Sequence, residues 1–543
     1  MEDHKTEWLP HLTNEVVADA HGNLLDAYAL SLEGWRRGLT LRWHVKDSEK
    51  FSEMLTWFVD KPGQLFSLSY KERTHYFFRT RGDKVTNEAV IIGKDKEKTK
   101  QTLQNAGVRV PEGKQFSEGK TDEEIVHYAS SIGYPVVLKP TDGSFGRGVI
   151  SNITSSGELE HSLSYLRTEL NYKDVIIEQY IPGEEYRLYV VENEVIGAIN
   201  RIPPNVIGDG VNSLKALIEL KNEERSLNPR LVSCPITVNQ ECIDFIGRKG
   251  YTLETVPEKD EQVFLSAKSN ISIGGDPIDV LDVLPQVVKD TAINAIKAVD
   301  GLSHGAVDLI IHNDRNINEA VFVIELNPTA QIGAILYPMS GKSRDVPAAI
   351  IDYYFPETKN MKVDRTKTFF DFHDVLDPLQ SRDASVTTVT PSPMDKIYSK
   401  KYTVSGEVQD LGYHRGLRKH AFERYLHGFV MNLENGDIEV VVAGTDPEMV
   451  DDFKNGLWED EERATVIEVQ EATYDEPIKV GFEIKADLKT QLEELKLYKQ
   501  ELEETELAMK KAEVQRRKFY ESLSWRATKP IRLVGAIIKR LSK

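Results

Sequence analysis

A lysine at the end of an apolar run is followed by a loop that holds three glycines. The run from Val136 to Leu138 leads into Lys139 and Pro140, and the loop that follows reads TDGSFGRGV. Glycines let backbone N–H groups approach a polyphosphate, and a lysine beside them adds a fixed positive charge. The pattern predicts a nucleotide held between strands. The usual phosphate-loop signature is excluded, because Gly341-Lys342-Ser343 has Leu336 where that signature requires a glycine.

Several separated segments, all in the same order, resemble one known family. Between Lys94 and Phe355 the chain resembles the ATP-grasp fold, most closely the ATP-grasp portions of cyanophycin synthetase and bifunctional glutathione synthetase. The segments are DKEKTKQTLQNAGVRVPEG, VVLKP, DGSFGRG, EQYIPGEEYR, SNISIGGDPIDVLD and GAVDLII with VFVIELNP. The resemblance implies an α/β ligase domain that binds ATP.

The resemblance also implies roles for individual residues around the nucleotide. Lys100 and Lys139 would reach the phosphates, while Glu178 and the Ile181 backbone would face the base and Glu185 the ribose. The glycine-rich loop would close as a lid over the γ-phosphate, and its residues are Gly143, Ser144, Gly146, Arg147 and Gly148.

Three further residues match the metal-ligand set of the same family. They are Asp308, Glu325 and Asn327. Mg²⁺ takes oxygen ligands and bridges nucleotide phosphates through one or two carboxylates. Alternation with period two puts Glu325 and Asn327 on one strand face, and Asp308 on a neighbouring strand would complete the set. The alternative is that these are ordinary polar residues at strand ends. We therefore expect ATP with Mg²⁺, and Mn²⁺ is the alternative ion.

The reaction that the resemblance implies is the activation of a carboxylate as an acyl phosphate, which an amine then attacks to give an amide. Arg201 and Lys268 are candidates to hold the carboxylate or the acyl phosphate, because both side chains bind oxyanions. The alternative is that they are surface charges. Two other functions stay open: a ligase that adds an amino acid to a cell-surface polysaccharide or its precursor, and a non-catalytic nucleotide sensor or scaffold.

A second resemblance, to acylphosphatase, covers residues 397–485. KYTVSGEVQDLGYHRG and GFVMNLENGDIEV match that family's pattern and imply a ferredoxin-like βαββαβ sandwich. The family cradles phosphate with an arginine and positions water with an asparagine. The asparagine is Asn432, but His414 stands at the arginine position, with Arg415 next to it, and Asp410 replaces a glycine. Because an acid repels phosphate, we expect a degenerate domain; an active acylphosphatase that removes stray acyl phosphate is the alternative.

The remaining parts of the chain are described by composition. We expect a small α/β domain at 1–93, the ATP-grasp domain at 94–356, a linker with one short helix at 357–396, a charged helix at 486–515 and a basic amphipathic tail at 516–543. In the charged helix, apolar residues recur every seven positions, which favours a coiled coil over a solitary solvated helix only marginally. These residues are Leu488, Leu495, Leu502 and Met509.

The tail and the overall charge bear on partners and location. The tail has nine basic residues, one acid and Trp525, which favours an anionic membrane surface over a helix docked on the protein's own acidic body. The 543 residues carry a net charge of −19, so nucleic acid is not an expected partner, and two cysteines fit a reducing compartment. No signal peptide or membrane-spanning run is apparent. We expect small-molecule substrates and a cytoplasmic location, peripheral at the inner membrane face if the tail binds lipid, with self-association left open.

Overall fold

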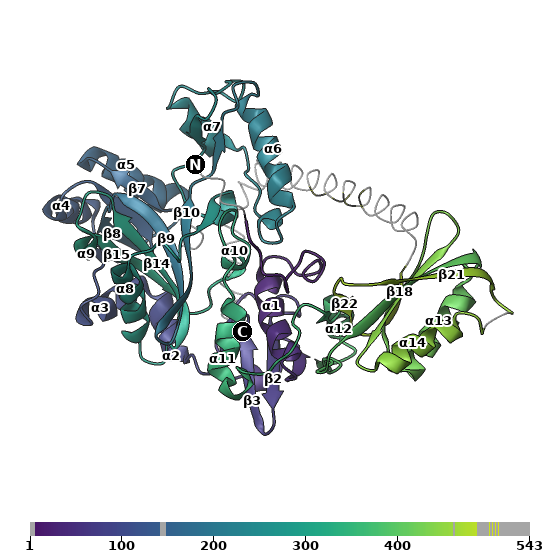
Figure 1. Ribbon diagram of the computed structural model, residues 1–543. Helices are drawn as coiled ribbons and strands as arrows, with labels where there is room; N and C mark the ends of the chain where they lie inside the picture. Colours follow the sequence, from purple (N-terminus) through teal and green to yellow (C-terminus); the bar gives the residue numbers. More distant parts are fainter. Residues whose placement is uncertain are drawn as a thin grey trace, which may run out of the picture. The chain divides into compact units, whose positions relative to one another are not determined.

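The computed structural model describes residues 6–141, 148–459 and 462–485, and in addition Lys499, Leu502, Thr505 and Met509. It divides into two compact units (Figure 1), one formed by residues 1–397 with 475–480 and the other by 398–474 with the chain from 481 onward. The expected lid residues at 142–147 lie outside the described residues. So do the basic tail and nearly all of the charged helix. Among the described helices, none has the length and apolarity needed to cross a membrane.

The first unit begins with an antiparallel sheet and a helix buried against it. The sheet order is β17-β1-β2-β3-β4. The bounds are α1 (Asn23–Arg36), β1 (Thr40–His44), β2 (Leu65–Tyr70), β3 (Arg73–Phe78), β4 (Arg81–Gly82) and β17 (Val386–Thr388). Aromatic side chains fill the space between them: Trp43 packs on Phe66 with ring centroids 5.1 Å apart, and Trp35 packs edge-on against Phe370. Burial of these large apolar side chains is the main stabilising term for this part of the fold.

The segment 357–396, expected as a linker, is part of this core, so the expectation is corrected. It contains β16 (Thr368–Phe369), α12 (Phe372–Gln380) and β17, and β17 pairs with β1. Phe370, Phe372 and Leu376 are at most 3% exposed and belong to the same apolar cluster as α1. The segment is polar overall, but its few buried aromatic residues pack it against the core.

A second antiparallel sheet has four strands, in the order β5-β8-β6-β7. The elements of this part are α2 (Asn87–Lys94), α3 (Lys96–Asn105), β5 (Gly113–Phe116), α4 (Asp122–Ile132), β6 (Val136–Pro140), β7 (Ile150–Ile153), α5 (Ser156–Ser164) and β8 (Val175–Gln179). Helix α4 begins with a capping box, in which Thr121 and Glu124 satisfy each other's backbone N–H groups. Asp95 caps α3 through the N–H groups of Glu97 and Lys98, which fixes the helix that carries Lys100.

The large sheet of the first unit lies between two apolar cores. Its order is β13-β10-β9-β14-β15. The elements are β9 (Gly183–Val191), β10 (Glu194–Ile202), β13 (Asp276–Asp279), α8 (Gln286–Lys297), β14 (His304–His312), α9 (Ile317–Ala320), β15 (Val321–Asn327), α10 (Gly333–Leu336) and α11 (Val346–Tyr354). On β9, Leu188 and Val190 join the core that holds α8, while Tyr189 and Val191 join the core that holds α1 and α11. This period of two explains why the strand reads as a continuous apolar run.

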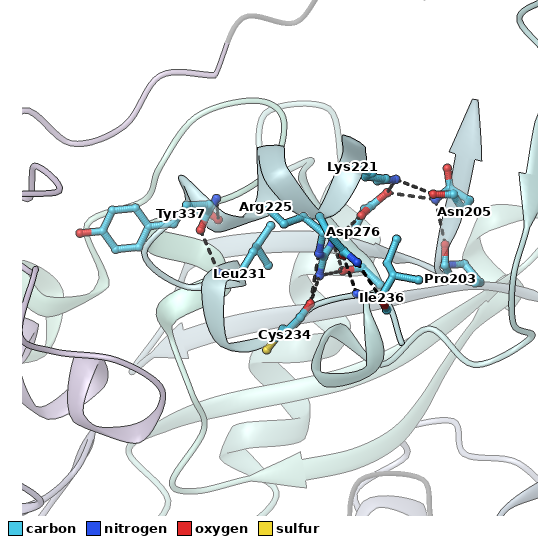
Figure 2. A network of polar contacts seen from close by, with 12 residues as sticks. Pro203, Asn205, Lys221, Arg225, Leu231, Cys234, Ile236, Asp276 and Tyr337 are labelled. Atoms are coloured by element: carbon cyan, nitrogen blue, oxygen red, sulfur yellow. Dashed lines mark hydrogen bonds and ion pairs between the residues drawn. The ribbon is translucent and has the colours of Figure 1, made fainter. Parts of the chain in front are cut away.

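Residues 203–275 form an insertion between β10 and β13. It contains β11 (Asn205–Ile207), α6 (Leu214–Ser226), α7 (Gln240–Gly247) and β12 (Gln262–Phe264), and it has an apolar cluster of its own. Figure 2 shows how α6 is fastened to the large sheet: Lys221 and Arg225 converge on Asp276, the first residue of β13. Arg225 is 1% exposed and also donates to the carbonyl oxygens of Cys234 and Gly275. A buried arginine with all its donors engaged is a rigid anchor.

The second unit is one sheet with two helices on one face (Figure 1). The sheet order is β21-β18-β20-β19-β23. The bounds are β18 (Tyr398–Glu407), α13 (Leu411–Glu423), β19 (His427–Asn432), β20 (Ile438–Gly444), α14 (Pro447–Gly456), β21 (Thr465–Thr473) and β23 (Phe482–Lys485). The order of elements up to β21 is the expected βαββαβ. Between β21 and β23 the chain contributes β22 (Ile478–Lys479) to the first unit, where it pairs in parallel with β16.

Candidate functional site

Two lysines share one buried carboxylate on the four-stranded sheet. The Lys139 Nζ lies 2.6 Å from Glu178 Oε2, and the Lys100 Nζ lies 3.9 Å from Glu178 Oε1. All three residues are at most 9% exposed. Burial lowers the pKa of Lys100, and Glu178 opposes that shift. Glu178, expected at the base, therefore holds the two ammonium groups side by side, which is the arrangement that a polyphosphate requires.

The glycine-rich loop begins directly after these residues. Lys96 Nζ donates to the carbonyl oxygen of Thr141 at 3.1 Å, just before the loop leaves the described residues. At the other end, Gly148 has a φ of 75°, a conformation that favours glycine. Gly143, Ser144, Gly146 and Arg147 lie outside the described residues, and their assignment to a lid stays a prediction. Ile181 follows β8 and is 4% exposed, so its side chain packs inside the protein.

One half of one face of the large sheet is polar. Tyr189, Ile199 and Ala306 line the apolar half and lie under α1 and α11. Residues two positions apart on a strand lie on the same face of the sheet. Two positions from each of these apolar residues, the same face carries a charged side chain. These side chains and their cross-strand neighbours are Glu185, Arg187, Arg201, Asp308, Glu325 and Asn327.

A β-bulge places Glu325 on that face. Asp308 pairs with Glu325 across β14 and β15, but the next residue, Leu309, pairs with Val323, so Ile324 is an extra residue in β15. Val321 and Val323 face the α8 core, and without the bulge Glu325 would follow them there. The structure thus brings Asp308, Glu325 and Asn327 together. Asn327 Nδ2 lies 3.5 Å from Asp308 Oδ2.

Asp308 is held by two arginines. Arg187 Nε and Nη2 lie 2.7 and 2.8 Å from its two oxygens, and Arg201 Nη2 lies 3.1 Å from Oδ2. Burial opposes ionisation of Asp308, but Arg187 and Arg201 outweigh it and lower its pKa to about 2. Asp308 is therefore a carboxylate at every physiological pH. Sequence reasoning missed Arg187; its signal was the position two residues after Glu185 on the same strand face.

Glu325 differs from Asp308 in having no partner. Among the described residues it makes neither an ion pair nor a hydrogen bond, although it is half-buried. Burial and the neighbouring Asp308 raise the pKa of Glu325, while the charges of Arg187, Lys96 and Lys139 oppose that shift. Lys139 belongs to the four-stranded sheet and Glu325 to the large sheet, so the charge of Lys139 acts on this carboxyl group from a different sheet.

These oxygen donors fit a divalent cation. Asp308 and Glu325 supply two carboxylates and Asn327 an amide oxygen, and Glu325 has its oxygens unengaged. The described residues hold no group of three or more His, Cys, Asp or Glu side chains placed for a metal ion. A Mg²⁺ ion here would therefore need further oxygens from a bound phosphate, as is usual for nucleotide-linked Mg²⁺.

The two candidates for holding the acyl group lie in different surroundings. Arg201 bridges Asp308 and Glu185, and Glu185 also accepts the hydroxyl of Ser269. Glu185, expected at the ribose, thus links Arg201 and Asp308 to the SNISIGG segment. Lys268 instead pairs with Glu241 of α7 at 2.7 Å and is partly exposed, so its charge is already compensated.

The candidates in the second unit lie on α13 and at the end of β19. His414 lies on the buried face of α13 and is 4% exposed, whereas Arg415, one residue on, is exposed. Asn432 is the last residue of β19, and Asp410 is the N-cap of α13. Arg415 therefore does not take the place of the arginine that the family has at position 414.

Comparison with protein families assigns two regions of the chain. Residues 95–198 match "Carbamoyl-phosphate synthase L chain, ATP binding domain", and residues 400–484 match "Acylphosphatase". Cyanophycin synthetase from Synechocystis sp. is 33% identical over 272 residues, which are 49% of this chain and 31% of that protein. The glutathione biosynthesis bifunctional protein GshAB from Desulfotalea psychrophila is 32% identical over 270 residues, 49% of this chain and 34% of that protein. The chain thus spans about a third of the length of these relatives.

Solved structures give matches of the same two kinds. The bifunctional glutathione synthetase from Pasteurella multocida is 28% identical with a TM-score of 0.42, over 54% of this chain and 40% of that chain. An acylphosphatase from Coxiella burnetii is 30% identical with a TM-score of 0.16, over 16% of this chain and 93% of that chain. From the family matches and the sequence relatives, the chain contains an ATP-grasp domain related to those of cyanophycin synthetase and GshAB, followed by an acylphosphatase domain.

Proposed function

We propose that this chain is an ATP-dependent ligase that joins a carboxylate to an amine through an acyl phosphate. The observation that supports it best is the grouping of Asp308, Glu325 and Asn327 on one face of the large sheet, where the charge of Lys139 acts on the pKa of Glu325. Oxygen ligands for a cation and a lysine for phosphates would then serve the same nucleotide. The names of the relatives, cyanophycin synthetase and glutathione biosynthesis protein, support amino acids or peptides as the substrate class.

In this proposal Lys100 and Lys139 bind the phosphates of ATP. Their shared partner Glu178 keeps both ammonium groups in place before the nucleotide arrives, so little side-chain entropy is lost on binding. Asp308, Glu325 and Asn327 would hold Mg²⁺, which neutralises charge on the phosphate oxygens when bound. Arg187 fixes Asp308 in the orientation that such a ligand needs.

The bond changes follow from the proposed intermediate. A carboxylate oxygen of the substrate attacks the γ-phosphorus of ATP, the bond to the β-phosphate oxygen breaks, and ADP leaves. The amine nitrogen then attacks the acyl carbon, the bond from that carbon to the phosphate oxygen breaks, and inorganic phosphate and the amine's proton leave. Arg201 lies next to Asp308 and is the cation that would stabilise the oxygens of the transferred group.

Hydroxylamine trapping tests the proposal without knowledge of the natural amine. The full-length protein is incubated with ATP, Mg²⁺, hydroxylamine and pools of amino acids, peptides or uronic acids. Carboxylate-dependent release of ADP, with one hydroxamate formed for each ADP, is expected because hydroxylamine intercepts an acyl phosphate.

Two variants control this assay. Glu325→Gln should lose carboxylate-dependent ADP release, because the neutral amide weakens the cation site. Glu319→Gln, on exposed surface six residues earlier, should turn over as the unmodified protein does. Formation of AMP and pyrophosphate would contradict the acyl-phosphate route, and tight ATP binding without turnover in any pool would favour a sensor.

A further inference from the structure

The N-terminus of α13 in the acylphosphatase domain is capped by a carboxylate side chain, that of Asp410. The Asp410 Oδ1 atom accepts the backbone N–H groups of Gly412 at 2.8 Å and Tyr413 at 3.2 Å. The first N–H groups of a helix have no partner within the helix and favour a negative charge. Here the carboxylate of Asp410 meets that demand. A phosphate dianion would have to displace it and would be repelled by it.

His414, one turn into the helix, presents an acceptor. Burial lowers the pKa of His414, which favours the neutral ring, while the Val408 backbone and Asp410 oppose that shift. Among the described residues, the buried Nε2 atom has no hydrogen-bond partner. A neutral ring with its proton on Nδ1 offers a lone pair at Nε2.

Asn432 adds a second acceptor: its Oδ1 atom is buried and has no hydrogen bond to any residue that the structure describes. Val430, two residues earlier on β19, lies in the core under α13, so alternation turns Asn432 toward the same helix. His414 lies on the buried side of α13. Gln409 holds the two elements together, because its Nε2 atom donates to the carbonyl oxygen of Leu433 at 2.8 Å. The acceptors therefore belong to the start of α13, its buried side and the end of β19, two elements that share one apolar cluster.

We propose that this site in the acylphosphatase domain binds a protonated primary amine. An ammonium group has three N–H donors and no acceptor, which matches Asp410, His414 Nε2 and Asn432 Oδ1. Buried acceptors without a donor cost free energy, and this ligand removes that cost while its charge meets the carboxylate. The proposal does not rest on the ligase function of the other unit.

One cation lies beside these acceptors. Arg463 is exposed, and its side chain crosses Gly412 so closely that a Cβ on that glycine would lie 2.9 Å from Arg463 Cδ. Its charge disfavours an ammonium ligand. We therefore expect Arg463→Gln to strengthen amine binding, which is opposite to the effect on an anion site.

Nuclear magnetic resonance of the histidine side chains in the full-length protein tests the proposal. The chain has 13 histidines, and a His414→Gln variant assigns the resonance of His414. Propylammonium should shift this resonance in a saturable manner. Tetramethylammonium, which has the same charge but no N–H donor, should not, and neither should inorganic phosphate.

Matched substitutions at two helix caps separate the site from a general loss of charge. Asp410→Asn keeps an oxygen for the α13 cap but removes the charge, and should weaken propylammonium binding by about tenfold. Asp446→Asn makes the same change at the cap of α14, where the side chain accepts the N–H of Glu448, and should leave binding unchanged.

A variant that carries the acylphosphatase family's residues at these positions tests the reverse change in ligand preference. A variant with Asp410→Gly and His414→Arg should lose propylammonium binding and gain phosphate binding. Saturable phosphate binding by the unmodified protein, or benzoyl-phosphate hydrolysis that Asn432→Ala abolishes, would overturn the proposal. So would the absence of any propylammonium shift at concentrations that do not unfold the protein, or equal weakening by Asp410→Asn and Asp446→Asn.

Discussion

Replacement of Lys139 by methionine perturbs folding and nucleotide binding together, and the structure shows how to separate them. The Lys139 and Glu178 side chains are only 9% and 11% exposed, and their charged atoms lie 2.6 Å apart. In Lys139→Met, the ion-pair partner that Glu178 keeps among the described residues is Lys100, at 3.9 Å. Breaking a buried ion pair from one side costs about 3 kcal/mol, because the remaining charge is left poorly compensated. Loss of activity in this variant alone would therefore not identify a phosphate ligand.

The double variant Lys139→Met with Glu178→Gln removes both charges. We expect it to regain part of the stability that the single variant loses, since no poorly paired carboxylate remains, while Lys100 keeps its charge without Glu178 as a partner. ATP affinity should stay low in both, by about tenfold or more, because the charge-assisted hydrogen bonds to the phosphates are missing. Hydrogen exchange of the amides in β6 and β8 measures the local stability, and calorimetric titration with ATP measures the affinity.

The exposed Lys114→Met on β5 of the same sheet is the matched control, and both quantities should be unchanged in it. If the double variant binds ATP as tightly as the unmodified protein, Lys139 serves only to neutralise Glu178. If the single variant is as stable as the unmodified protein, the ion pair contributes nothing to the fold.

Two further substitutions test buried charges elsewhere in the first unit. Burial raises the pKa of Asp26 from its usual value of 3.8 to about 6, although the charge of Arg230 opposes the shift. Between these two pH values the folded protein binds a proton that the unfolded chain has lost. As the pH rises from about 4 through 6, this group makes folding less favourable by up to about 3 kcal/mol. Asp26→Asn cannot ionise, so its free energy of unfolding should not fall for this reason, and the difference from the unmodified protein should grow in its favour across this pH window. Parallel pH profiles of the two proteins would contradict the assignment. Arg225→Met should destabilise the insertion by about 3 kcal/mol, because Asp276 loses one of its two cations, and faster proteolysis within residues 203–275 would report it, whereas an unchanged rate would not fit the anchor.

Much of the fold could be predicted, because its segments combine apolar runs with turn residues in a recognisable order. The segment 357–396 could not. Its strand β17 pairs with β1, far away in the sequence, with Thr388 opposite Arg42. The two exposed positions of this three-residue strand hold one apolar residue, Val386, and one polar residue, Thr388. Periodicity gives no signal for so short an edge strand. Its pairing with β1 and the burial of nearby residues such as Phe370, Phe372 and Val389 hold it in place.

The candidate site shows the same division between residue identity and geometry. Asp308, Glu325 and Asn327 could be named from the sequence, and alternation gave Glu325 and Asn327 a common face. Alternation from Val321 through Val323, however, would have buried that face under α8. The bulge at Ile324 turns it to the opposite side, where Asp308 lies, and no sequence pattern indicates an extra residue in a strand of this length.

Arginine partners illustrate why a list of ligands is not yet a site. Two buried carboxylates close together tend to take up a proton, and they bind a cation well only if neighbouring positive charges keep one of them ionised. Arg187 and Arg201 do this for Asp308, while Glu325 beside it makes no hydrogen bond or ion pair with the residues that the structure describes. One carboxylate is thereby held ionised and oriented, and the other keeps its oxygens unengaged. The asymmetry follows from strand register, since Arg187 lies directly opposite Asp308, and it is this asymmetry that makes the pair suitable for a cation brought in with a phosphate.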